Sequence, residues 1–290
     1  MLAAATLWAT FGLFAKRLYT AGFTPLELAS IRTWIGWLGL ALLAASRPQR
    51  LRITRRDLPF FALYGIGAFA LFEVLFLIAL ERTGVAIAAA MLYTAPAFVV
   101  LISAIVLREH LPLRHWLALF LVLAGVTLVT GAAGAVLTGT APLSGLVLLV
   151  GLGSGLAYGC YTIFSKRAAG RYDDEIFVVF WMFAFATLGL TVVAPPFAAM
   201  ARPHGEWPAL LGLGIVPTLL PYILYLTALR WLHASTAAML ASVEPVMAAL
   251  LALVLLGETL DPPRIAGIVL IAAAAALLTR KVEQVEAEAG

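Results

Sequence analysis

Long apolar segments dominate this chain, and short polar connections that contain Pro or Gly separate most of them. Each apolar segment holds about 20 residues, which is the length of helix that crosses a hydrocarbon core of about 30 Å. The pattern predicts membrane-spanning helices at approximately 2–19, 25–46, 58–80, 84–107, 113–131, 143–168, 175–198, 207–231, 234–256 and 263–280. Only Glu81, Arg82 and Thr83 separate the third predicted helix from the fourth.

Composition supports a membrane protein and excludes several other classes. Hydrophobic residues make up 63% of the chain and charged residues only 12%, whereas soluble proteins average about 25% charged residues. We therefore predict an all-α integral membrane protein and not a soluble protein with buried helices. The single cysteine, Cys160, excludes an intramolecular disulfide and any metal site built on several cysteines. No metal, cofactor or nucleic-acid partner is expected.

The distribution of Lys and Arg predicts the orientation in the membrane. In a ten-helix arrangement, one side carries thirteen of the 19 basic residues, among them Arg52, Arg108 and Arg167. The other side carries five, among them Lys16 and Arg264, and Arg32 lies within a span. Because basic residues in short loops mark the cytoplasmic face, both termini are expected in the cytoplasm. The expected location is the plasma (inner) membrane.

An internal repeat divides the chain into two halves. A step of 149 positions places residues 79–130 on 228–279 without a gap, with Pro96 on Pro245 and Glu109 on Glu258. The sequence thus predicts a first five-helix repeat at 1–131, a second at 143–281 and an acidic cytoplasmic tail at 282–290. Because five is odd, the second repeat is expected to cross the membrane in the opposite direction. Inverted repeats of this kind are a recurrent architecture of transporters.

A second match lies at the start of each half. Residues 14–17 (FAKR) resemble residues 164–167 (FSKR) at a step of 150, and Trp8 and Phe11 fall on Tyr158 and Tyr161. The charge count places the first Lys-Arg pair outside and the second inside, as inversion requires.

The segments around the two repeated prolines resemble the EamA repeat of the drug/metabolite transporter superfamily. The matching residues are 88–96 (AAAMLYTAP) and 107–111 (LREHL) in the first half, and 237–245 (AAMLASVEP) and 256–260 (LGETL) in the second. The resemblance covers nearly the whole chain and implies ten spans, with Arg32 as the arginine often found in the second span. Residues 72–74, Tyr93 and segment 157–166 look like the branch that exports aromatic amino acids.

Three ionisable residues lie inside predicted spans, namely Arg32, Glu73 and Glu244. Such residues are costly in a bilayer and are functional candidates by default. Arg32 and Glu73 are expected at a similar depth, about 10 Å below the outer surface. Two interpretations stay open for them: a structural ion pair, or a carboxylate that binds a substrate ammonium or a proton beside Arg32. Glu244 directly precedes a proline, and we predict that Glu73→Gln or Glu244→Gln lowers transport without loss of expression.

Prolines and aromatic residues complete the candidate site. Pro96, Pro245, Pro217 and Pro221 each remove a backbone donor within a span, and they are candidate hinges or simple structural kinks. Aromatic residues at depth either pack or contact a planar substrate, and the candidates for substrate contact are Trp8, Phe11, Tyr93, Tyr158, Tyr161 and Tyr222. Gly151, Gly155 and Gly159 form a small-residue face that is expected to contact another helix closely.

These features predict a secondary transporter that exports small organic metabolites across the inner membrane by alternating access. Amino acids are favoured as substrates, aromatic ones in particular. A multidrug or nucleotide-sugar-type carrier is the alternative, followed by a channel. An enzyme is not expected, because no catalytic constellation is present. The predicted partners are a small-molecule substrate and the lipid bilayer; the oligomeric state stays open, and a monomer is compatible with the sequence. The substrate cavity is expected between spans one, three, four, six, eight and nine.

Overall fold

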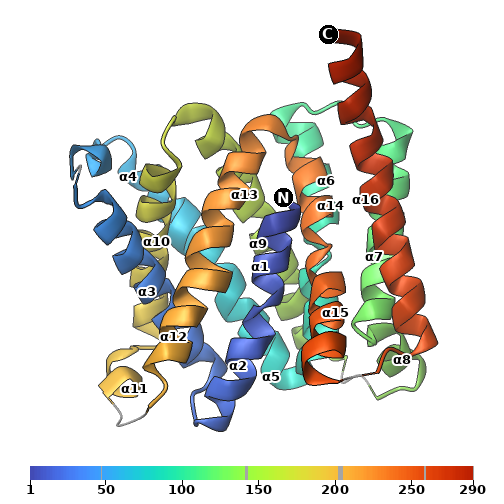
Figure 1. Cartoon of the computed structure of the whole chain (residues 1–290), viewed down its shortest axis with the longest axis horizontal. Helices are drawn as coiled ribbons and strands as arrows, with labels where there is room; N and C mark the ends of the chain where they lie inside the picture. Colours follow the sequence, from blue (N-terminus) through green and yellow to red (C-terminus); the bar gives the residue numbers. More distant parts are fainter. Residues whose placement is uncertain (47, 141–142, 202–204, 258, 290) are drawn as a thin grey trace.

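The computed structural model describes residues 1–46, 48–140, 143–201, 205–257 and 259–289 (Figure 1). Within these ranges all regular secondary structure is helical. Glu258, the predicted counterpart of Glu109, lies outside the described residues, as do Arg47, Pro142, Arg202 and Pro203.

The helices follow the predicted apolar segments. The first half contains α1 (Leu2–Ala9), α2 (Phe11–Thr20), α3 (Pro25–Ala44), the 3-10 helix η1 (Pro48–Leu51), α4 (Leu58–Ala62), the π-helix η2 (Leu63–Ala70), α5 (Leu71–Leu92), α6 (Ala95–Ile102), the π-helix η3 (Ser103–Leu107) and α7 (Leu113–Val129). The second half contains α8 (Ala132–Leu137), α9 (Gly145–Arg171), α10 (Glu175–Val193), α11 (Phe197–Ala201), α12 (Trp207–Gly214), the π-helix η4 (Ile215–Leu219), α13 (Leu220–Trp231), α14 (Ala234–Ala241), α15 (Glu244–Leu256) and α16 (Pro262–Ala289).

Seven helical stretches of the described chain are long and apolar enough to cross a membrane. One of them, Leu58–Leu107, has 50 residues and would be about 75 Å long as one straight helix. Gly84, with φ 77° and ψ 172°, interrupts this stretch, and the chain reverses there (Figure 1). The reversal falls at the residue that directly follows the predicted Glu81–Thr83 connection. Glycine permits the turn at this position because it adopts a positive φ without steric cost. The full ten-span arrangement stays a prediction.

Helix breaks recur at the step of 149 residues that relates the two halves of the sequence. In the first half α5 ends at Leu92 and α6 begins at Ala95; in the second, α14 ends at Ala241 and α15 begins at Glu244. Each break directly precedes a repeated proline, which lacks the N–H that would continue the helix. The left-handed residues Arg108 (φ 55°) and Gly257 (φ 67°) are related by the same step.

Small residues allow close approach of several helix pairs. The face formed by Gly151, Gly155 and Gly159 contacts α5 and α6, as the sequence predicts; a Cβ at Gly155 would lie 2.8 Å from the carbonyl oxygen of Met91. The helices α7 and α16 cross at Gly125 and Gly267. A Cβ at Gly267 would lie 2.6 Å from the carbonyl oxygen of Gly125, so a larger residue forces the two helices apart.

We expect Gly267→Val to lower the free energy of unfolding by about 1–3 kcal/mol, the usual range for overpacking. The added atoms meet backbone atoms of α7, which cannot rotate away as a side chain can. The midpoint of thermal unfolding of the purified protein in detergent measures the effect. Gly170→Ala is the matched control, because no atom lies within 4 Å of its added Cβ. An equal shift in both variants would contradict the packing argument.

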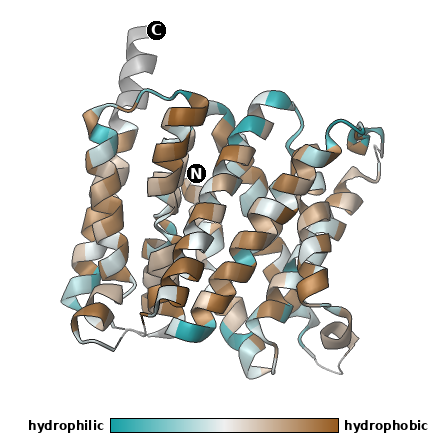
Figure 2. Cartoon of the chain, turned by 180° about the vertical axis from the view of Figure 1, so that it is seen from behind, coloured by the Kyte–Doolittle hydropathy of each residue, from teal (hydrophilic) through white to brown (hydrophobic). Residues whose placement is uncertain are grey.

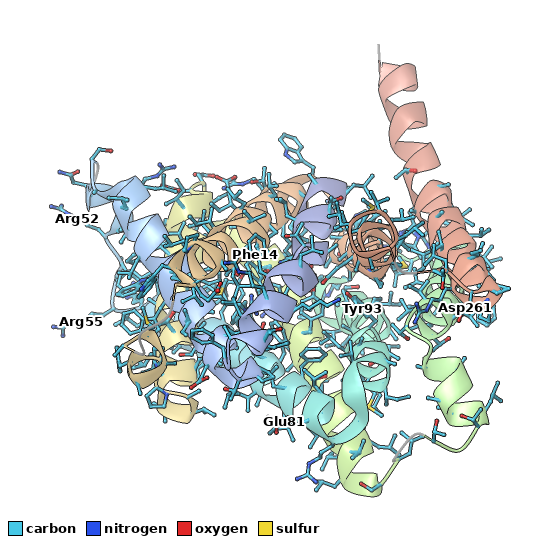
Figure 3. All side chains as sticks on the ribbon, turned by 60° about the horizontal axis from the view of Figure 1, so that its bottom comes forward. Phe14, Arg52, Arg55, Glu81, Tyr93 and Asp261 are labelled. Atoms are coloured by element: carbon cyan, nitrogen blue, oxygen red, sulfur yellow. The ribbon has the colours of Figure 1, made fainter. Side chains whose placement is uncertain are left out.

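The most hydrophilic segments gather at the two ends of the helix bundle, and the helices between them are mostly hydrophobic (Figure 2). We call one end the arginine-rich end; it includes the connection between α3 and α4, which carries Arg52 and Arg55, and the turn at Arg108 (Figure 1). The other, the opposite end, includes Glu81, the turn at Asp261 and the start of α16 (Figures 1 and 3). The turns at Arg108 and Asp261, which the repeat relates, thus lie at different ends of the bundle.

Candidate functional site

A cavity of about 700 Å³ extends from the middle of the helix bundle to the opposite end. Eight of the nine residues that the sequence singles out for substrate or proton binding line it: Trp8, Phe11, Arg32, Glu73, Tyr93, Tyr158, Tyr222 and Glu244. The predicted spans one, three, four, six, eight and nine all contribute. The structure adds residues from the second, fifth and tenth predicted spans, for example Ala29, Val129 and Arg264. We call this space the central cavity.

Arg32 and Glu73 form an ion pair on the wall of the central cavity. Arg32 lies on α3 and Glu73 on α5, and each residue is only 6% exposed. A second nitrogen of Arg32 lies 3.4 Å from the hydroxyl oxygen of Thr218. The guanidinium also lies over the Phe11 ring, 5.6 Å from its centre. This geometry supports the ion-pair interpretation, and the exposed edge of the pair still faces the cavity.

The surroundings of the Glu244 carboxylate differ from those of the Glu73 carboxylate. It is the first residue of α15, directly after the helix break, and it lines the central cavity. Its side chain interacts with the hydroxyl of Tyr93, which lies among the helices in Figure 3. Within the described chain no Lys, Arg or His nitrogen lies within 4.0 Å of the Glu244 carboxylate. A carboxylate without a cationic partner in such a cavity can accept a proton or a ligand ammonium.

Aromatic rings form the inner wall of the central cavity. Trp8 contacts Tyr222 edge-on, with ring centres 5.4 Å apart, and Tyr158 lies 5.1 Å from Phe72. The indole nitrogen of Trp8 and Nε of Arg32 are buried and have no hydrogen-bond partner in the described structure. Both side chains line the cavity, although the two nitrogen atoms themselves are enclosed in this conformation.

Tyr161, the ninth predicted site residue, does not line the central cavity. It is 1% exposed and stacks against Tyr158 on one side and Tyr225 on the other, at 5.7 and 5.9 Å. Residues 158 and 161 share one helix face, which is why the sequence alone does not separate them. Tyr161 supports the cavity wall from behind.

Two of the four candidate hinge prolines line the central cavity, and the other two do not. Pro217 and Pro245 line the central cavity, whereas Pro96 and Pro221 are buried outside its lining. Pro245 follows Glu244 at the break between α14 and α15, and Pro217 lies within the π-helix η4. The prolines that face the cavity therefore come from the second half of the chain, although Leu92 and Tyr93, at the first-half break, line it as well.

Side-chain hydrogen bonds close the bundle between the central cavity and the arginine-rich end. The Thr162 and Tyr225 hydroxyls lie 2.8 Å apart, and those of Tyr64 and Ser165 lie 2.7 Å apart. Lys166 donates to the carbonyl oxygen of Leu229 at 2.7 Å, at the end of α13. Sequence reasoning missed these contacts, although hydroxyl groups at depth in apolar segments signal a need for partners.

An ion-pair network, also missed from the sequence, covers the arginine-rich end. Asp57 accepts hydrogen bonds from Thr54 and Tyr172, at 2.6 and 2.8 Å, and pairs with Arg171. The Thr54 hydrogen bond, with those partners, lowers the pKa of Asp57 below its ordinary value of 3.8. Burial, together with Asp57, raises the pKa of Tyr172 to about 12. Nearby, Arg230 pairs with Glu175 at 2.6 Å.

We expect Asp57→Asn to lower the unfolding temperature by a constant amount between about pH 5 and about pH 9. The pKa of Asp57 is lowered by folding, so its contribution is complete above the unfolded-state value of about 3.9 and is lost as the pH falls through the lower folded value. The pKa of Tyr172 is raised, so its contribution is complete below about 10 and is lost as the pH rises through about 12. Thermal unfolding at several pH values tests this. A difference between the two proteins that changes near pH 7 would contradict it.

Among the described residues, no group of three or more His, Cys, Asp or Glu side chains is placed to hold a metal ion.

Comparison with known proteins finds transporters that are similar to this chain over most of its length. The EamA-like transporter family matches residues 1–131 and 145–280. An uncharacterized transporter of Archaeoglobus fulgidus is 29% identical over 282 residues, which cover 96% of this chain and 94% of that protein. The threonine/homoserine exporter RhtA of Escherichia coli is 28% identical over 250 residues, covering 83% of this chain and 75% of RhtA. A solved crystal structure with 22% identity aligns with a TM-score of 0.79 over 98% of this chain and 96% of the other.

Proposed function

This chain belongs to the EamA-like transporter family, and we propose that, as a membrane transporter of that family, it exports amino acids across the inner membrane by alternating access. The observation that carries this proposal is the polar composition of the central cavity. Glu244 offers a carboxylate without a cationic partner, and Trp8 and Arg32 offer N–H groups without acceptors. A zwitterion with one ammonium and one carboxylate satisfies both kinds of group at once.

The shape of the molecule supports alternating access. The central cavity reaches the opposite end beside Lys16 and Arg264, while hydrogen bonds and ion pairs close the arginine-rich end. The excess of Lys and Arg favours the arginine-rich end as cytoplasmic. We therefore assign this conformation as open to the outside. Release of solute outward, followed by rocking about Pro217 and Pro245, would complete export.

The proposed architecture is ten spans in two inverted five-helix repeats, 1–131 and 143–281. Two observations support it: the helix breaks recur at a step of 149, and the family matches two successive segments of the chain. In addition, the turns at Arg108 and Asp261 lie at different ends (Figure 1). An inverted pair of repeats makes outward-open and inward-open states related packings of the same units.

Two classes of amino acid suit the central cavity. The rings of Trp8, Phe72 and Tyr158 favour an aromatic side chain, which they can stack against. The similarity to RhtA favours small hydroxyl-bearing amino acids. An amine without a carboxylate, as a multidrug carrier would take, needs Glu244 and the rings but leaves the Trp8 N–H without an acceptor. Nucleotide sugars are less suited, since Glu73 already balances the charge of Arg32, which leaves that residue an N–H donor for one carboxylate but no net positive charge for two phosphates.

Uptake into proteoliposomes tests this proposal. Labelled threonine, homoserine, phenylalanine and tyrosine are supplied, with organic cations and a nucleotide sugar for comparison, each with and without a pH gradient. We expect saturable uptake and counterflow of at least one amino acid, and neither feature is expected of a simple channel. Transport restricted to cations without a carboxylate would favour the multidrug alternative, and non-saturable flux would favour a channel.

A further inference from the structure

A second cavity, of about 580 Å³, lies at the arginine-rich end, apart from the central cavity. It is bounded by the end of η3, the last turns of α9 and the start of α14. Its lining includes Arg108, Lys166, Arg167 and Arg171. We call it the basic pocket. Other cations at this end, such as Arg52 and Arg55, project from the edge of the molecule and line neither of these two cavities (Figure 3).

The charge of the basic pocket is not balanced by its own carboxylate. Glu109 also lines it, but that side chain accepts hydrogen bonds from the backbone N–H and hydroxyl of Ser235 and from the N–H of Ala234, at 2.7–3.4 Å. Arg171 pairs with Asp57. In the described structure no carboxylate lies within 4.0 Å of the charged atoms of Arg108 or Arg167. Two exposed guanidinium groups thus share one concave space without a counter-ion.

The repeat relates the basic pocket to the mouth of the central cavity. A step of 150 carries Lys16, which lines the central cavity, to Lys166, which lines the basic pocket. In this conformation Lys166 is held by the carbonyl oxygens of Leu229 and Leu232, at 2.7 and 2.9 Å. The basic pocket in the second half of the chain therefore corresponds to the open mouth of the central cavity in the first half, but it is closed in this conformation.

We propose that the basic pocket is the inner entrance of the transport path and that Arg108 and Arg167 bind the oxyanion of the solute there, its carboxylate, before the path opens. This inference rests on the proposed export of amino acids. Guanidinium groups bind carboxylates strongly and often through two parallel hydrogen bonds. A solute that approaches carboxylate-first would leave its ammonium free for Glu244 deeper in the path.

A cysteine in the basic pocket tests the binding step without requiring transport. No atom lies within 4 Å of a Cβ built at Gly170, which lines the basic pocket. Gly170→Cys in a Cys160→Ser background therefore places one thiol there. Anionic and cationic methanethiosulfonate reagents then report the local charge. We expect the ratio of anionic to cationic reaction rates to fall about tenfold when Arg108→Gln and Arg167→Gln are added.

Protection of this thiol distinguishes the sources of the oxyanion. Threonine or phenylalanine should slow labelling at position 170 severalfold, whereas the corresponding amides, which keep the ammonium and lack the carboxylate, should not. Ser46→Cys, an exposed position at the same end, is the control and should show no protection. Protection by phosphatidylglycerol but not by amino acids would overturn the assignment and identify a lipid headgroup site. Protection by neither ligand, with no change in the rate ratio, would overturn it as well.

A transport assay provides a second test of the proposed role of the basic pocket. In inside-out membrane vesicles, we expect Arg108→Gln with Arg167→Gln to raise the KM for amino-acid uptake about tenfold or more with little change in maximal rate. The control is Arg52→Gln with Arg55→Gln, which removes the same charge outside the basic pocket. An unchanged KM would contradict the inference while leaving amino-acid export intact. Absence of all amino-acid transport would refute the proposed function, and thiol protection would still decide what the basic pocket binds.

Discussion

Replacement of Glu244 by glutamine is expected to reduce the efficiency of amino-acid export about 10- to 150-fold. The change keeps the shape of the side chain and removes the one carboxylate of the central cavity that has no cationic partner. A hydrogen bond to a charged group is worth about 1.5–3 kcal/mol, and each 1.36 kcal/mol is a factor of ten. Expression and thermal stability should change little, because no ion pair is broken.

Initial rates in proteoliposomes over a range of solute concentrations measure this effect. The matched control is Glu81→Gln, an exposed carboxylate at the opposite end that does not line the central cavity (Figure 3). Efflux at the normal rate in the Glu244 variant would remove Glu244 from the site.

The same variant separates two roles of Glu244, transfer of a proton and binding of the solute. If Glu244 carries a proton, exchange of solute for solute persists in the variant while the response to a pH gradient disappears.

Replacement of Arg32 by leucine should produce the largest loss of stability, about 3 kcal/mol or more. The variant leaves the Glu73 carboxylate, which is 6% exposed, without its cation. Removal of one partner from a buried ion pair typically costs about 3–5 kcal/mol, because the remaining charge is no longer compensated. Thermal unfolding in detergent measures the change. Transport should be lost as well, because the pair forms part of the cavity wall.

The double variant Arg32→Leu with Glu73→Leu separates a structural role from a functional one. Stability should return to near the original value, since replacement of both charges by apolar groups is often neutral or favourable. Restored stability without transport would place the pair in the solute path. Restored transport would show that the pair is structural only. A single Arg32→Leu variant as stable as the original protein would contradict the ion-pair argument.

Particular residues show how far the sequence predicts this molecule. Pro96 and Pro245 locate the helix breaks, because proline cannot donate the next hydrogen bond whatever the surroundings. The depth of Arg32 and Glu73 follows from their distance to the ends of their helices, so their pairing could be anticipated. Intrinsically costly residues in apolar segments are therefore informative without a structure.

Other features depend on contacts between segments that are distant in sequence. Tyr158 and Tyr161 lie on the same face of one helix, so the sequence does not separate them. Only Tyr158 lines the central cavity, because the neighbouring helices determine which ring is covered. Apart from Thr54, the partners of Asp57 and Lys166 lie in or just after other helices, more than 60 positions away. Helical periodicity identifies a face of one helix, but it does not identify the helix that covers that face.

The closure of the arginine-rich end has one further consequence. Its ion pairs, Asp57 with Arg171 and Arg230 with Glu175, lie at a surface that water reaches. Screening shortens the range of such interactions from about 8 Å at physiological ionic strength to about 3 Å at 1 M salt. With the arginine-rich end facing the cytoplasm, as proposed, added salt should shift the conformer population toward the inward-open form, and dilute buffer should favour the outward-open one.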